Sequence, residues 1–140
     1  MKSITTLSVT LATYNESKNI TQCLEAIQDI ASEIIVVDGQ SQDNTVTLAK
    51  KFKQAKVIST TNKPMFHINK QMGIDECQGD WILQLDADEI VTPSLKKEIV
   101  SILNKIPDTV AENGFWVPRS NYFLGSFLTK GGQYPDYTLR

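Results

Sequence analysis

An acidic motif follows a short apolar segment in the second half of the chain. Residues 81–85 are apolar apart from one glutamine, and the carboxylates of Asp86, Asp88 and Glu89 come directly after them. Such a short apolar run predicts a buried strand, and like charges at its end resist burial unless a cation neutralises them. Mg²⁺ and Mn²⁺ prefer oxygen ligands and often share them with substrate phosphates. The motif therefore predicts a strand end that binds a divalent cation and a phosphorylated ligand.

Two aspartates of this motif have the spacing of a ligand pair. Asp86 and Asp88 are two positions apart, so on an extended chain their side chains point to the same side. The small side chain of Ala87 leaves room for a ligand against the backbone. An alternative interpretation is a solvated acidic turn that caps the next helix, because short acidic motifs recur by chance.

The composition is that of a globular domain. A chain of 140 residues with 41% hydrophobic and 21% charged residues is long enough to build a core and is ordinary in both fractions. The formal net charge of -2 and the pI of about 5.4 give no case for a nucleic-acid-binding surface. No apolar stretch approaches the roughly 20 residues of a membrane span.

The cysteines and the N-terminal residues bear on the cellular compartment. Cys23 and Cys77 match no metal-binding or redox spacing, and both fall in predicted helices, so we expect buried free thiols. Free thiols suit a reducing compartment. Residues 1–6 lack the apolar core and cleavage site of a signal peptide. We therefore expect a cytoplasmic protein.

Apolar segments alternate with segments of helical periodicity. The predicted strands are Leu7–Ala12, Glu33–Asp38, Lys56–Ser59 and Asp80–Leu85. The predicted helices carry Ile20, Leu24 and Ile27 (capped by Asn15 or Ser17), then Val46, Leu48, Ala49 and Phe52, then Phe66–Cys77, and finally Leu95, Ile99, Ile102 and Leu103 after the cap Thr92-Pro93. This order predicts a three-layer, Rossmann-like α/β fold with a mainly parallel sheet.

Three polar clusters follow predicted strands, at residues 13–16, 38–41 and 86–88. Ligands of parallel α/β sheets bind beyond the carboxyl ends of the strands. The fold therefore gathers these clusters into one site. After Asn113 the pattern changes to irregular strands and loops with exposed aromatic residues, so we divide the single domain into residues 1–112, which bind the ligand, and residues 113–140.

With these clusters in place, the chain resembles family 2 glycosyltransferases of the GT-A fold, in residues 8–16, 33–45 and 81–89. Residues 114–125 and 131–136 resemble the bacterial β-1,4-glucosyltransferases of the lipopolysaccharide core. By this resemblance, residues 1–112 would be the nucleotide-sugar-binding part and residues 113–140 the start of the acceptor-side region. The resemblance implies transfer, with inversion, of a sugar from a nucleotide-diphosphate donor such as a UDP-hexose to a glycan or lipid-linked acceptor. It also implies a divalent cation, Mn²⁺ or Mg²⁺, and peripheral association with the inner face of the cytoplasmic membrane.

The resemblance assigns roles to individual residues. The nucleotide-sugar-binding residues would be Thr13, Tyr14, Asn15, Glu16, Asp38, Lys70, Asp86 and Ala87, with Asp38 recognising the base. Asp88, together with Asp86, would bind the cation. As alternatives, Asp38 caps the following helix and Lys70 is a solvated lysine. The family turn often reads Ser-Gly-Ser or Gly-Gly-Ser, whereas Gln40 occupies the middle position here and reduces backbone freedom.

Inverting members use a downstream carboxylate as general base. The resemblance places this residue beyond Arg140, and we expect the chain to be the N-terminal part of a longer protein. Asp136 is the only acid among the last ten residues, but it follows Pro135 in a segment that reads as a turn, so we do not expect it to be the base.

Three other function classes fit parts of the pattern. A phosphotransferase of the haloacid dehalogenase type also places Asp-x-Asp after an apolar strand, although normally after the first one. A nucleotidyltransferase would need a glycine-rich loop with basic residues after the first strand, which is not present here. A non-catalytic nucleotide-sugar-binding domain would need no base.

Overall fold

The computed structural model describes residues 5–62, 64–65, 67–105, 110–132 and 134–140. The chain divides into two compact units, Met1–Val110 and Ala111–Arg140. Each unit has its own sheet structure and is described by itself.

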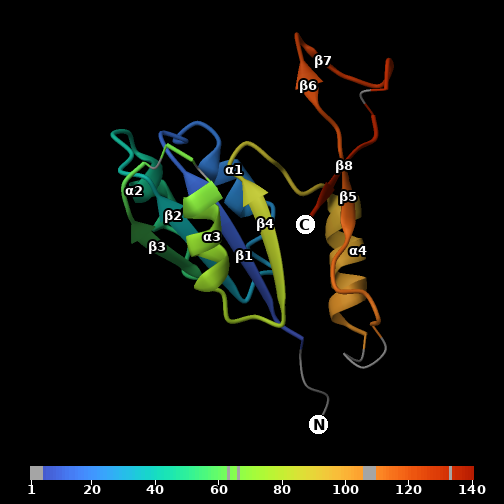
Figure 1. Cartoon of the computed structure of the whole chain (residues 1–140), viewed down its shortest axis with the longest axis horizontal. Coiled ribbons are helices and arrows are strands. Elements are labelled where there is room, and N and C mark those ends of the chain that lie inside the picture. The colour runs from blue at the N-terminus through green and yellow to red at the C-terminus, as the bar shows by residue number, and fades with distance from the viewer. Residues whose placement is uncertain (1–4, 63, 66, 106–109, 133) are drawn as a thin grey trace. The chain divides into compact units, whose positions relative to one another are not determined.

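A four-stranded parallel sheet forms the centre of the first unit (Figure 1). Its strands are β1 (Leu7–Thr13), β2 (Glu33–Asp38), β3 (Ala55–Ser59) and β4 (Trp81–Asp86), in the order β3-β2-β1-β4. Every adjacent pair is parallel. Residues 34–37 of β2 are fully buried, as a continuous apolar strand covered on both faces must be. The predicted α/β fold with a parallel sheet is confirmed.

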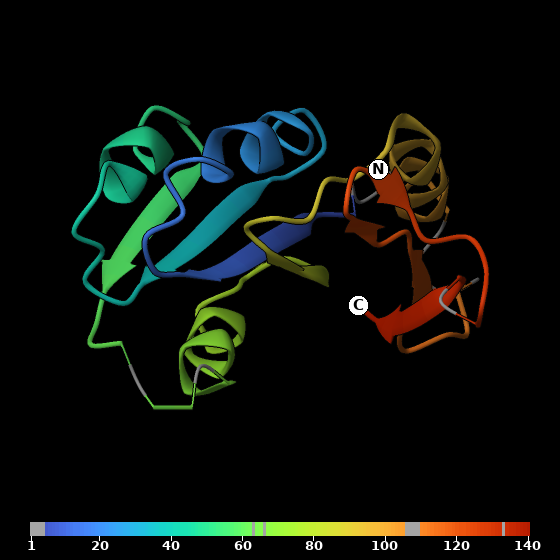
Figure 2. The same ribbon diagram turned by 90° about the horizontal axis from the view of Figure 1, so that it is seen from above.

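Helices cover both faces of this sheet, which gives three layers. Figure 2 shows α1 (Ile20–Glu25) and α2 (Thr45–Ala49) on one face and α3 (His67–Asp75) on the other. A fourth helix, α4 (Pro93–Leu103), begins as predicted: the hydroxyl of Thr92 accepts a hydrogen bond from the backbone N–H of Leu95 at 3.2 Å, and proline takes the first helical position. No helix formed by the described residues is long and apolar enough to cross a membrane.

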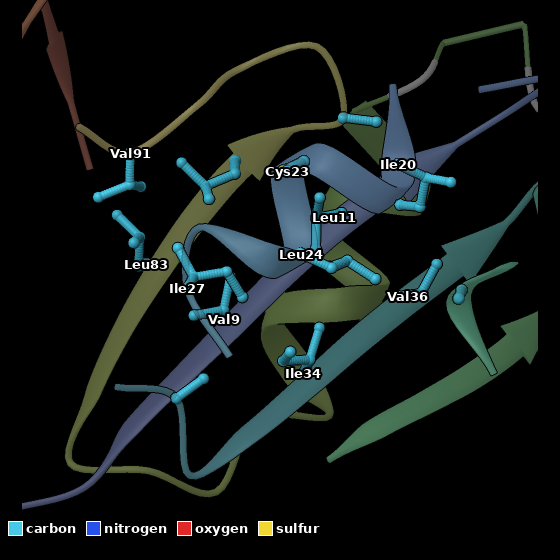
Figure 3. Close-up of a cluster of buried hydrophobic side chains, with 14 of the residues drawn as sticks. Val9, Leu11, Ile20, Cys23, Leu24, Ile27, Ile34, Val36, Leu83 and Val91 are labelled. Carbon is cyan, nitrogen blue, oxygen red and sulfur yellow. The ribbon is translucent and has the colours of Figure 1, made fainter. Parts of the chain in front are cut away.

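The main hydrophobic core lies between the sheet and α1 (Figure 3). Val9 and Leu11 of β1 meet Ile20 and Leu24 of α1, and all four side chains are almost completely buried. From α4, Leu95, Ile99 and Leu103 pack against the same cluster, whereas Ile102, also predicted on that face, is not among them. This burial of apolar area is the main stabilising contribution to the unit.

Two helix ends differ from the prediction. Asn15 and Ser17 do not cap α1, which starts only at Ile20; the backbone of Asn15 is left-handed (φ 57°), which a helix start does not allow. The predicted helix 66–77 is observed as α3 and ends at Asp75, so Cys77 lies beyond the helix and is only half-buried. Its predicted first residue, Phe66, lies outside the described residues.

The second unit consists of two small antiparallel sheets. One pairs β5 (Trp116–Arg119) with β8 (Asp136–Leu139), and the other is a hairpin of β6 (Tyr122–Phe123) and β7 (Ser126–Phe127). Several aromatic side chains of this unit are exposed, as expected for the irregular C-terminal segment: Trp116, Tyr122, Phe123, Phe127, Tyr134 and Tyr137.

Gly73 allows α3 to approach β1 closely. A β-carbon at this position would lie 2.1 Å from Oγ1 of Thr10 and 3.3 Å from Cγ2 of Val37. The hydroxyl of Thr10 is buried and has no hydrogen-bond partner among the described residues. The helix therefore packs against β1 through a position that tolerates no side chain.

We predict that Gly73→Ala lowers the free energy of unfolding by about 1–3 kcal/mol, because overpacking outweighs the better helix propensity of alanine. Thr10→Ala in the same chain should recover part of this loss, since it removes the obstructing hydroxyl. Urea denaturation of the two single variants and the double variant measures the coupling. Strictly additive effects would show that the two side chains do not collide.

Candidate functional site

The carboxyl ends of β1, β2 and β4 meet at one edge of the parallel sheet (Figure 1). Thr13 at the end of β1 is paired in register with Asp38 at the end of β2. On its other side, Ala12 is paired with Asp86 at the end of β4. The structure thus brings together the strand ends from which all three predicted clusters begin.

Hydrogen bonds join the loop after β1 to the loop after β2. The backbone N–H of Asn15 donates to the hydroxyl of Ser41 at 2.8 Å, and the side-chain oxygen of Asn15 accepts from the backbone of Gln42 at 2.7 Å. The backbone N–H of Glu16 donates to the hydroxyl of Thr45 at 2.7 Å. These bonds fix the two loops as one wall, and Tyr14 projects from that wall with 42% of its surface exposed.

Asp43 strengthens this wall and was not singled out from the sequence. Its carboxylate accepts from the hydroxyl and the backbone N–H of Thr45 and, at 3.0 Å, from the backbone N–H of Ser17. These donors, Thr45 first, hold the pKa of Asp43 well below its ordinary value. The Asp-x-Thr spacing before a helix is a local turn signal that could have indicated this role.

The carboxylate of Asp38 is buried and organises the loop that follows it. One oxygen accepts hydrogen bonds from the hydroxyl of Thr13 at 3.2 Å and from the hydroxyl of Ser41 at 2.6 Å. The other oxygen accepts a hydrogen bond from the backbone N–H of Ser41 at 2.9 Å. The alternative interpretation of Asp38 as a helix cap is wrong, because α2 starts only at Thr45. Recognition of a base by Asp38 stays a prediction.

An ion pair connects α3 to the end of β4. Nζ of Lys70 lies 2.5 Å from Oδ1 of Asp86, and the Lys70 side chain is only 14% exposed. The alternative interpretation of Lys70 as a solvated lysine is therefore wrong. The sequence predicts both residues near the ligand but not their contact, because no local pattern links a helix residue to a strand end 16 positions later.

The acidic motif turns sharply at the end of β4. The backbone N–H of Asp86 donates to the Glu89 carboxylate at 3.0 Å, and the N–H of Glu89 donates to the carbonyl oxygen of Asp86 at 2.9 Å. Ala87 is buried and Asp88 is exposed. The expectation that Asp86 and Asp88 lie on one extended chain is wrong, because the strand ends at Asp86 and Glu89 closes a turn.

Cys23 of α1 lies beneath this turn. Its thiol donates to the carbonyl oxygen of Asp86 at a sulfur–oxygen distance of 3.8 Å. Burial, and then the charges of Glu89, Asp88 and Asp86, raise the pKa of Cys23 to about 12. The thiol therefore stays protonated and supports the turn by packing rather than acting as a nucleophile or a metal ligand.

The donor atoms at this edge fit a cation that is shared with phosphates. Within the described part of the chain, no three His, Cys, Asp or Glu side chains gather to hold a metal ion by themselves. Mg²⁺-type sites commonly use one or two carboxylates, and substrate phosphates and water complete the coordination. The exposed Asp88 and the partly buried Asp86, two positions before it, match that arrangement and not a closed metal cage.

Comparison with known protein families shows to which family this chain belongs. The sequence model of the family described as Glycosyl transferase family 2 matches residues 8–125. The chain belongs to glycosyl transferase family 2. The match includes all the strand ends described above.

Curated relatives of this family 2 member include an uncharacterized glycosyltransferase of Rickettsia conorii, 37% identical over 95 residues, which are 66% of this chain and 32% of the relative. Another is the SPbeta prophage-derived glycosyltransferase SunS of Bacillus subtilis, 32% identical over 98 residues, with 69% of this chain and 23% of the relative covered. The chain thus spans less than a third of the length of either relative.

Solved structures with a similar fold are larger transferases. A mannosyltransferase of Pyrobaculum calidifontis in complex with GDP-Man and Mn²⁺ superposes with a TM-score of 0.58 at 20% identity, covering 69% of this chain and 31% of its own. Glucosyl-3-phosphoglycerate synthase of Mycobacterium tuberculosis, in complex with Mn²⁺, UDP and glucosyl-3-phosphoglycerate, gives 0.58 at 24% identity, covering 71% and 40%. These likenesses confirm the predicted GT-A fold.

Gln40 lies in the turn after β2 and has a backbone conformation that glycine adopts without strain. Its φ is 65°, in the left-handed region, where residues with a β-carbon lose about 1–2 kcal/mol. Asn15 is also left-handed but belongs to a residue type that tolerates this region better. The glutamine therefore holds this left-handed conformation at a cost in local strain.

We predict that Gln40→Gly raises the free energy of unfolding by up to about 1 kcal/mol, because the relieved strain exceeds the 0.4–1 kcal/mol that glycine adds to unfolded-state entropy. Gln40→Ala, which keeps a β-carbon, is the control and should not stabilise the chain. Thermal and urea unfolding give both values. Equal stability of the two variants would contradict strain at this position.

Proposed function

We propose that this chain is the donor-binding part of a metal-dependent, inverting glycosyltransferase that uses a nucleotide-diphosphate sugar, most simply a UDP-hexose. The observation that supports this best is the convergence of three polar strand ends at one edge of a family 2 parallel sheet. In such sheets the ligand lies beyond the carboxyl ends of the strands.

Each part of the edge has a task in this proposal. The exposed ring of Tyr14 offers a stacking surface for the base. The hydrogen-bonded wall of Asn15, Ser41 and Thr45 holds the Tyr14 ring in place. Asp38 recognises the base or fixes the loop that does so.

The diphosphate lies against the turn at Asp88, where a bound Mn²⁺ or Mg²⁺ would neutralise phosphate charge. Lys70 provides a positive charge on the facing helix.

We further propose that the acceptor is a glycan or a glycolipid. The resemblance of residues 114–125 and 131–136 to lipopolysaccharide core glucosyltransferases supports a glycan or glycolipid acceptor. The exposed aromatic side chains of the second unit, Trp116 and Tyr122 among them, are of the kind that stack on sugar rings.

Asp136 is poorly suited to be the general base. Its Oδ2 accepts from Asn121 at 3.0 Å and from two nitrogens of Arg119 at 3.1 and 2.6 Å. Asn121 and then Arg119 hold the pKa of Asp136 below its ordinary value, which weakens it as a proton acceptor. We therefore propose that a different carboxylate, outside residues 1–140, is the base.

The alternatives have less support. A haloacid-dehalogenase-type phosphotransferase would place its acidic motif after the first strand, whereas Asp86 ends β4 and the chain belongs to a glycosyltransferase family. A non-catalytic nucleotide-sugar-binding role makes the same prediction for donor binding and differs only in transfer.

We predict that UDP binds this chain at least about tenfold more tightly with Mn²⁺ than with a chelator, since diphosphate and the acidic turn otherwise repel each other. Asp88→Asn should remove this difference. Glu98→Gln, an exposed acid of α4 with the same change in charge, is the matched control and should keep it. Calorimetry supplies the affinities; equal binding with and without Mn²⁺ would refute the metal role.

We predict that Asp136→Asn, in the whole protein, lowers sugar transfer by less than about tenfold, because loss of a general base usually costs about 10²–10⁴-fold. Transfer of hexose from a UDP-hexose to a lipopolysaccharide core acceptor is the measurement, with the melting temperature as a check on folding. A loss within that larger range in a folded variant would identify Asp136 as the base.

A further inference from the structure

The Lys70–Asp86 ion pair occupies the edge at which a cation would bind. The two charged atoms are 2.5 Å apart, and the lysine side chain, 14% exposed, is more buried than the aspartate, 35% exposed. A partly buried pair is screened by salt much less than an exposed one. The contact therefore persists at physiological ionic strength.

This pair changes what a free cation meets at the acidic turn. Lys70 neutralises Asp86, and the carboxylate of Glu89 accepts a hydrogen bond from the backbone N–H of Asp86 at 3.0 Å. Asp88 is left as the exposed carboxylate of the motif. One exposed carboxylate binds a divalent cation weakly unless phosphate oxygens add further ligands. The donor-free chain should therefore have little affinity for the metal alone.

We propose that Lys70 is an internal counter-ion that withholds Asp86 from free divalent cations and moves to the donor diphosphate when cation and donor arrive together. This inference rests on the proposed function. The lysine ammonium is a compact charge on a flexible stem, so it can change partner without backbone movement. Each charge remains paired through the exchange, and no covalent bond forms or breaks.

The exchange has a thermodynamic consequence. Because Asp86 becomes available only as Lys70 leaves it, donor and cation each improve the binding of the other, and this coupling is reciprocal. Removing the Lys70 ammonium should abolish this coupling between donor binding and cation binding. Affinity for the metal alone rises, whereas affinity for the donor in the presence of metal falls.

Titration of the chain with Mn²⁺ alone, followed by the electron paramagnetic resonance signal of free Mn²⁺, tests the first half. We expect Lys70→Gln to bind Mn²⁺ roughly tenfold more tightly than the wild type, within the usual range of site–site coupling. Lys70→Arg keeps the charge and should behave as the wild type. Lys56→Gln removes the same charge and also breaks an ion pair, the 2.7 Å contact with Glu76, and should change nothing.

Two further measurements complete the test. UDP at saturating Mn²⁺ should bind Lys70→Gln more weakly than the wild type, and the double variant Lys70→Gln/Asp86→Asn should lose the gain in Mn²⁺ affinity. If Lys70→Gln does not fold, Lys70→Met, which keeps an apolar stem, replaces it.

Unchanged Mn²⁺ affinity in folded Lys70→Gln, or an equal gain in Lys56→Gln, would overturn the counter-ion role. Failure of the wild type to bind UDP would instead overturn the proposed function. The titration with Mn²⁺ alone does not depend on UDP, so the two failures are distinguishable.

Discussion

The parallel pairing of β1 with both β2 and β4 is the constraint on which the rest of this molecule depends. It makes β1 the central strand and brings the ends of its neighbours to within one residue of its own end. Residues separated by more than 70 positions, such as Thr13 and Asp86, thereby belong to one edge. The helices close both faces of the sheet, so this edge remains the place where polar groups can gather.

Most polar residues at this edge form hydrogen bonds with one another. Asp38 and Asp43 accept hydrogen bonds from the loops around them, and the loops after β1 and β2 hold each other through Asn15 and Ser41. Hydrogen bonds to charged groups are stronger than neutral ones. A wall formed in this way needs little ordering when a ligand binds, and less ordering leaves more of the contact energy for affinity.

The sheet was predictable from the sequence, whereas many polar contacts at its edge were not. Continuous apolar runs such as residues 34–37 identify buried strands, and their alternation with helical periodicity identifies the layers. The start of α1 and the turn at Asp88 were predicted wrongly, because a left-handed Asn15 and the Glu89 carboxylate decide them. The Lys70–Asp86 contact depends on how closely α3 packs on the sheet, which local sequence patterns do not report.

That packing distance gives Gly73 an indirect electrostatic role. Lys70 lies three residues before it on α3, so the bare backbone at position 73 sets how far the lysine stem must extend to reach the sheet edge. A larger residue there would act as a spacer between the two layers. The lysine stem would then have to extend further to reach Asp86, so a residue without charge would alter the electrostatics of the turn.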